Sequence, residues 1–144
     1  MTLDHVGLSV ADMDAQAAWY AAAFGLTPVE EGSIPHLSVR IVFLVDPART
    51  WALELLQRDG SVPGARYRTA PESLLTQGFG HICLRVADVD SAFEELLAVG
   101  ASPVMAPSPA PVPGVRMAYV ADPEGNLIEL LDRPGPPGTG MDRT

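Results

Sequence analysis

Apolar and polar residues alternate in two short stretches of the chain, at positions 4–10 and again at 80–86. A two-residue period of β-branched and apolar side chains predicts a strand with two different faces. A longer period follows each stretch, at 15–24 and 91–99, and predicts an amphipathic helix. Aspartates suited to cap the two helices stand close before these segments: Asp12 or Asp14, and Asp88 or Asp90.

This pattern occurs twice because the sequence itself repeats. His5–Asp14 and His81–Asp90 share six of their ten residues at an offset of 76. Leu53–Gln57 matches Ile128–Asp132 at an offset of 75. Two separate matches at nearly one offset indicate that the chain contains two copies of one module.

The second part of each copy predicts a short strand followed by a hairpin. Asp-Pro and Gly-Asn residues mark the hairpin turns, since proline presets φ and glycine or asparagine accepts a positive φ. Each copy therefore follows the order βαβββ, and we predict an α+β fold of two tandem modules. The expected strands are 27–31 and Val39–Val45 with Trp51–Gln57 in the first copy, and 102–105 and Val115–Ala121 with Leu127–Asp132 in the second.

The modules define the expected domain organisation. We predict a single domain over residues 1–133, with module one at about 3–57, a linker at 58–78 and module two at about 79–133. The stretch 106–114 is rich in proline and is expected to be an extended loop. Residues 134–144 contain glycine and proline in a pattern typical of a disordered tail.

Two histidines and two glutamates stand at matching places in the copies. His5 and His81 begin the first strand of each module, and Glu54 and Glu129 lie in the apolar last strand. A carboxylate on such a strand is costly to bury unless it is paired or binds a metal. Two imidazoles and two carboxylates make a divalent-cation site if the repeat brings them together. Cys83 shares a strand face with His81, and we interpret it as a buried, inert thiol.

Composition and charge indicate which binding partners and which cellular compartment to expect. The 144 residues carry a net charge of −9, with nine arginines and no lysine, which argues against nucleic acid or an anionic membrane as a partner. One cysteine fits a reducing compartment. No stretch approaches the roughly 20 apolar residues of a membrane helix, and the first residues lack the features of a signal peptide. We therefore expect a cytoplasmic protein.

The motifs together resemble those of the vicinal oxygen chelate superfamily. This superfamily includes glyoxalase I, methylmalonyl-CoA epimerase, extradiol dioxygenases and the bleomycin and fosfomycin resistance proteins. The resemblance covers about residues 3–133 and rests on the strands that begin at His5 and His81, the turn Asp122–Asn126 and Ile128–Leu130. It implies paired modules that form a U-shaped mixed sheet around a central cavity.

The resemblance also implies a metal site and an activity. The implied ligands are His5, Glu54, His81 and Glu129, the set that bacterial glyoxalase I presents, around one divalent ion (Ni, Co, Zn, Mn or Fe(II)). Glu129 is then the base that removes a proton next to a carbonyl, and Glu54 acts on the opposite face of the substrate. We expect a lyase or isomerase of the lactoylglutathione lyase type, acting on a small vicinally oxygenated molecule without an organic cofactor.

Other members of the superfamily leave alternatives open. The chain could be an epimerase-like enzyme, or an Fe(II) dioxygenase-like enzyme that uses His5, His81 and Glu129 without Glu54. A metal-free drug- or metabolite-binding protein of the bleomycin resistance type is the alternative without catalysis. The resemblance further implies a homodimer, with the site formed either within one chain or between two chains.

Overall fold

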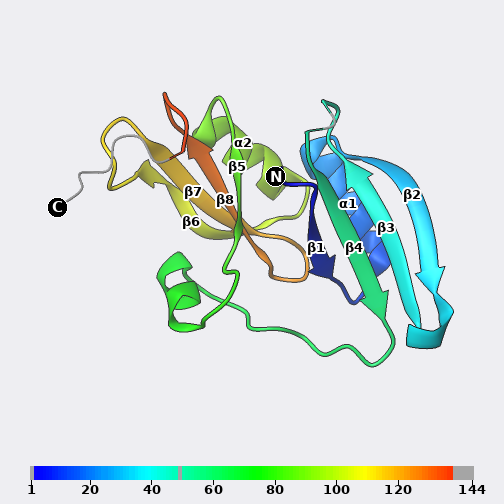
Figure 1. The fold of residues 1–144 in the computed structure, drawn as a ribbon. Coiled ribbons are helices and arrows are strands. Elements are labelled where there is room, and N and C mark those ends of the chain that lie inside the picture. Colours follow the sequence, from blue (N-terminus) through cyan, green and yellow to red (C-terminus); the bar gives the residue numbers. More distant parts are fainter. Residues whose placement is uncertain (1, 49, 138–144) are drawn as a thin grey trace. The chain divides into compact units, whose positions relative to one another are not determined.

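The computed structural model describes residues 2–48 and 50–137. They form two compact units, which divide between Ala65 and Arg66. Figure 1 shows the helices and strands of both units. The first contains β1 (His5–Ser9), α1 (Met13–Phe24), β2 (Thr27–Ile34), a 3₁₀ turn (Pro35–Leu37), β3 (Val39–Val45) and β4 (Ala52–Arg58). The second contains a 3₁₀ helix (Ala70–Leu75), β5 (Ile82–Arg85), α2 (Val89–Ala98), β6 (Ser102–Pro109), β7 (Arg116–Ala121) and β8 (Leu127–Asp132).

Both units form the same four-stranded mixed sheet. The strand order is β1-β4-β3-β2 in the first and β5-β8-β7-β6 in the second. The first strand pairs in parallel with the last, and the remaining pairs are antiparallel. The predicted α+β fold of two βαβββ modules is therefore confirmed.

The change of offset from 76 to 75 has its origin in the hairpin turns. Val45 pairs with Ala52, which leaves six residues in the β3–β4 turn. Ala121 pairs with Leu127, which leaves five residues in the β7–β8 turn. The shorter turn moves every residue of β8 by one position, so that the glutamates of β4 and β8 still occupy equivalent places in their sheets.

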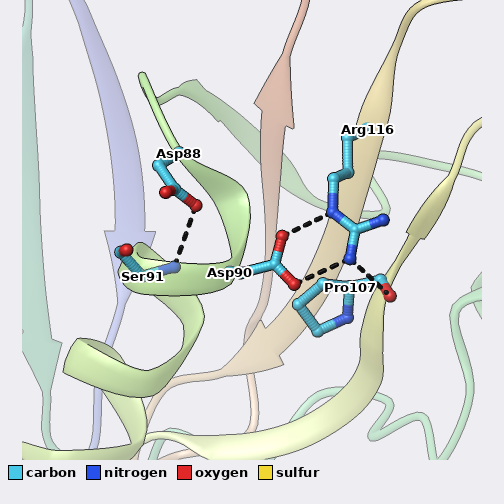
Figure 2. Close-up of polar contacts among 5 residues, drawn as sticks. All are labelled: Asp88, Asp90, Ser91, Pro107 and Arg116. Atoms are coloured by element: carbon cyan, nitrogen blue, oxygen red, sulfur yellow. Dashed lines mark hydrogen bonds and ion pairs between the residues drawn. The ribbon is translucent and has the colours of Figure 1, made fainter.

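Of the aspartates that the sequence offers as helix caps, the structure selects Asp12 and Asp88. The Asp12 carboxylate accepts a hydrogen bond from the Ala15 amide at 3.0 Å. The Asp88 carboxylate accepts one from the Ser91 amide at 3.1 Å (Figure 2). These bonds satisfy amides that have no partner inside the helix, which is why the helices begin at Met13 and Val89.

The strands that follow the helices are longer than the sequence predicted. Instead of ending at 31 and 105, β2 reaches Ile34 and β6 reaches Pro109. Both are edge strands, each paired with one neighbour only. An edge strand tolerates proline because the missing N–H can face away from the ladder, so part of the predicted proline-rich loop belongs to the sheet.

The helix of each unit packs on one face of its sheet and makes the core there. On that face, the core residues of the two central strands of each sheet are no more than 4% exposed: Val42, Leu44, Leu53 and Leu55, and Ala118, Val120, Ile128 and Leu130. Because side chains alternate along a strand, the residues between these positions lie on the opposite face. Among the described residues, no helix is long and apolar enough to cross a membrane.

Each helix is also tied to its sheet by an ion pair that recurs with the repeat. Asp14 of α1 pairs with Arg40 of β3 at 3.0 Å. Asp90 of α2 accepts two hydrogen bonds from the Arg116 guanidinium of β7, at 2.5 and 2.7 Å, and Arg116 also donates to the Pro107 carbonyl at 3.4 Å (Figure 2). The two-bond geometry fixes the start of α2 against β7.

Hydrogen bonding by Arg116 holds the pKa of Asp90 below its ordinary value. The ionised carboxylate therefore stabilises the fold at neutral pH, and this contribution is lost as pH falls through the lowered folded-state pKa. We expect Asp90→Asn to lower the urea midpoint at about pH 7, and the difference from wild type to disappear at about pH 2. Glu94→Gln, an exposed change on the same helix, is the control. An Asp90→Asn difference that persists in acid would contradict this account.

Candidate metal centre

The last strand of each sheet places one glutamate on the face away from the helix. In β4 the leucines on both sides of Glu54 are buried in the core, and in β8 Ile128 and Leu130 are buried on both sides of Glu129. The two glutamate side chains are 17% and 14% exposed. Each carboxylate thus lies on the surface of a sheet, close to water but among apolar neighbours.

His5 lies beside Glu54 in the first unit. Its Nε2 atom is 3.4 Å from Oε2 of Glu54, and its Nδ1 atom lies 2.8 Å from Oδ1 of Asp4. The hydrogen bond with Asp4 is the main cause of a raised His5 pKa. The imidazole packs edge-on against Phe43, with ring centroids 5.3 Å apart at 88°. When Nδ1 of a neutral imidazole donates a hydrogen bond to a carboxylate, the lone pair of Nε2 is available to bind a metal. This arrangement is common among metal-binding histidines.

His81 and Glu129 repeat this arrangement in the second unit. His81 precedes β5 directly, and its Nε2 atom is 3.2 Å from Oε2 of Glu129. The imidazole packs edge-on against Tyr119, with ring centroids 5.3 Å apart at 83°. The structure therefore brings the four predicted residues together as two equivalent histidine–glutamate pairs, one in each unit.

The two pairs differ in how the carboxylate is held. Cys83 and Tyr119 are the cross-strand neighbours of Glu129, and both side chains hydrogen-bond its carboxylate. Their counterparts in the first sheet are Gly7 and Phe43, which carry no donor group. Glu129 is consequently fixed by two donors that have no equivalent in the first unit.

These contacts shift the pKa values around Glu129. Burial opposes ionisation of Glu129, but hydrogen bonds from His81, Cys83 and Tyr119 lower its pKa overall. Loss of solvent around the sulfur, together with the nearby carboxylate, raises the pKa of Cys83 to about 12. The same two causes raise the pKa of the Tyr119 phenol. Around neutral pH the glutamate is therefore an anion that accepts hydrogen bonds from a neutral thiol and a neutral phenol.

Each pair offers one imidazole nitrogen and one carboxylate to a divalent ion. Within residues 2–48 and 50–137, no three His, Cys, Asp or Glu side chains gather into one metal-like cluster. A zinc-type ion takes three or four protein donors, so a single pair is half of a donor set. In chemical type, the two pairs taken together fit a divalent ion bound by nitrogen and oxygen.

Comparison with protein families supports the resemblance drawn from the sequence. The family model described as "Glyoxalase/Bleomycin resistance protein/Dioxygenase superfamily" matches residues 2–130. The chain belongs to this superfamily. That match runs through both units and includes all four residues of the two pairs.

Relatives within the glyoxalase superfamily carry related names. A lactoylglutathione lyase of Arabidopsis thaliana is 28% identical over 131 residues, which are 90% of this chain and 43% of the relative. A probable lactoylglutathione lyase of Synechocystis is 27% identical over 133 residues, 91% of this chain and 95% of the relative. Glyoxalase I from Zea mays has the same fold, with a TM-score of 0.75 at 23% identity over 94% of this chain and 46% of that chain. The chain thus spans less than half the length of the Arabidopsis and maize proteins.

At the candidate site the structure corrects one prediction and adds two residues. Cys83 is exposed as a residue, so the prediction that it is buried is wrong. Partial shielding of its sulfur and the nearby Glu129 carboxylate still raise its pKa, which agrees with an inert thiol. The sequence analysis missed Phe43 and Tyr119, the aromatic partners of the two histidines. The repeat could have revealed them, since they stand 76 positions apart in matching strands.

The exposed thiol gives a test of the hydrogen bonding around Glu129. Because its pKa is about 12, Cys83 of the metal-free protein should react with iodoacetamide at about pH 8 on the order of a thousandfold more slowly than free cysteine. Glu129→Gln removes the charge that disfavours the thiolate and should speed the reaction. Glu54→Gln, the matched change in the other unit, should leave it unaltered. Rapid alkylation of the wild type would contradict the hydrogen-bonded thiol.

Proposed function

We propose that the protein is a divalent-metal-dependent lyase or isomerase that moves a proton on a small, vicinally oxygenated substrate. The observation that carries the proposal is the histidine–glutamate pair repeated in both units, on the sheet face away from the helix, at 3.4 and 3.2 Å. Membership of the glyoxalase superfamily and relatives named lactoylglutathione lyase support the same chemistry.

In this proposal, His5, Glu54, His81 and Glu129 hold one ion, which is Ni, Co, Zn, Mn or Fe(II). The set can form within one chain or between the two chains of a homodimer, which we propose acts in the cytoplasm. When bound, a divalent ion supplies Lewis-acid stabilisation of negative charge on the substrate oxygens. The acidic chain and its lack of lysine remain the argument against a nucleic-acid partner.

The two glutamates supply the proton transfer. A carboxylate can take a proton next to a carbonyl and return it to the neighbouring carbon. We assign the first step to Glu129, whose orientation is fixed by Cys83 and Tyr119. Glu54 acts on the opposite face of the substrate. Its carboxylate has no donor at the places of Cys83 and Tyr119, which leaves it freer to turn.

The place of Glu54 favours this assignment over a dioxygenase. A site built on His5, His81 and Glu129 alone gives Glu54 no role. In the structure, Glu54 faces its histidine almost as closely as Glu129 does, and both histidines carry the same edge-on aromatic contact. This equivalence supports a set of four donors.

Metal content tests the ligand set. We expect elemental analysis to find one divalent ion per chain in the wild type. Affinity should fall in His5→Ala and His81→Ala by more than the roughly 10- to 100-fold that loss of an outer partner costs. His36→Ala is the matched control, since this third histidine is exposed and lies outside both pairs. Wild-type protein that takes up none of the five ions would contradict the proposal.

Turnover of methylglyoxal and glutathione to lactoylglutathione tests the reaction. Glutamine keeps the shape of glutamate but cannot accept a proton, so Glu129→Gln should lower kcat by roughly 100-fold or more. Glu54→Gln should lower it as well, and His36→Ala should not. Full activity of Glu54→Gln together with consumption of O₂ would favour the dioxygenase. If the wild type binds metal but does not form lactoylglutathione, this substrate is excluded. The proposed metal site is not contradicted by that result.

A further inference from the structure

A second feature of the Arg66–Thr144 unit is a hollow of about 390 Å³ beyond the end of β8. Most of its lining is apolar, and among the described residues Arg133 is the one charged residue in it. The lining consists of Val112, Pro113, Val115, Arg133 and Pro134–Pro136. Arg133 follows directly after β8, which ends at Asp132.

Arg133 lines this hollow, and its side chain carries one donor that the described residues do not use. Its Nε atom is buried and has no hydrogen-bond partner among the described residues. A buried donor without a partner is costly, and native proteins rarely leave one unless a ligand or water takes the bond. The guanidinium offers its N–H groups as a planar fork, which matches the two oxygens of a carboxylate.

The wall of the hollow is held to the sheet by a specific contact. Arg85, on the Glu129 face of β5, donates a hydrogen bond to the carbonyl of Gly135. This bond fixes the segment after β8, which otherwise belongs to the predicted disordered tail, whose last residues, 138–144, lie outside the described part. Val112 and Pro113 close another side, and they come from the predicted proline-rich loop.

We propose that this hollow binds the carboxylate end of the substrate, and that the substrate is a small monocarboxylate with a hydrocarbon body. One guanidinium within apolar walls suits a single negative charge, whereas a phosphate dianion calls for more than one cation in a chain of net charge −9. The valine and proline side chains accept a hydrocarbon group without loss of hydrogen bonds.

Arg133 comes directly after β8, four residues beyond Glu129, which is about 13 Å along an extended strand. Two long side chains separated by that distance can contact opposite ends of one small molecule. The inference rests on the proposed function in one respect, because it takes the bound carboxylate to be part of the molecule on which Glu129 acts.

Binding to metal-free protein tests the inference separately from catalysis. After removal of metal and chelator, titration calorimetry compares cyclohexanecarboxylate with cyclohexanecarboxamide, which has nearly the same size but no charge. We expect the carboxylate to bind wild type about tenfold or more tightly than the amide. Arg133→Met should abolish this preference and keep amide binding. Arg68→Met, which removes an equal charge from a residue paired with Glu72, should preserve it.

Three other results would each overturn the inference. Equal binding of acid and amide by the wild type would do so even if the Arg133→Met protein failed to fold. A preference that survives in Arg133→Met would place the carboxylate elsewhere. Tighter binding of cyclohexylphosphonate than of the carboxylate would assign the hollow to a different anion. Since neither metal nor turnover enters the measurement, loss of the proposed function would leave these results unchanged.

Discussion

The two-residue alternation of side chains along β4 and β8 determines where the core lies and where the glutamates lie. Every second residue of these strands is committed to the core under the helix, with Leu53, Leu55, Ile128 and Leu130 at most 1% exposed. The glutamate between them cannot enter that core without losing its hydration. The helix therefore fixes the position of each carboxylate indirectly, by fixing the register of the strand that carries it.

Much of this organisation is readable from the sequence because it depends on local patterns that occur twice. Alternation predicts the strand at His5, and the turn residues predict the hairpins. The offset near 76 shows that Glu54 and Glu129 occupy equivalent positions in the two modules. The lengths of β2 and β6 were not predictable in this way, because a proline in the sequence does not reveal whether its strand lies at an edge. Arg133 and its hollow depend on how a loop and the chain after β8 pack, and such packing leaves no periodic signal.

The two modules are more alike in their backbone than in their side-chain chemistry. The edge-on ring beside each histidine is preserved, but Phe43 becomes Tyr119 and Gly7 becomes Cys83. Both changes add a hydrogen-bond donor beside the same carboxylate. One half of the candidate site is thus held more firmly than the other, and the hollow that Arg133 lines belongs to the same unit as the firmly held half. A site with one fixed and one freer carboxylate suits a reaction in which the two have different roles.

We propose that His5, Glu54, His81 and Glu129 bind one ion. A crystal structure of the cobalt-loaded protein, with an anomalous difference map at the cobalt edge, would show the ligands of this ion. We expect one strong peak per chain, with two imidazole nitrogens and two carboxylate oxygens at about 2.0–2.2 Å, the distances usual for such ligands. A peak bound to one histidine–glutamate pair without the other, or to different residues, would contradict it.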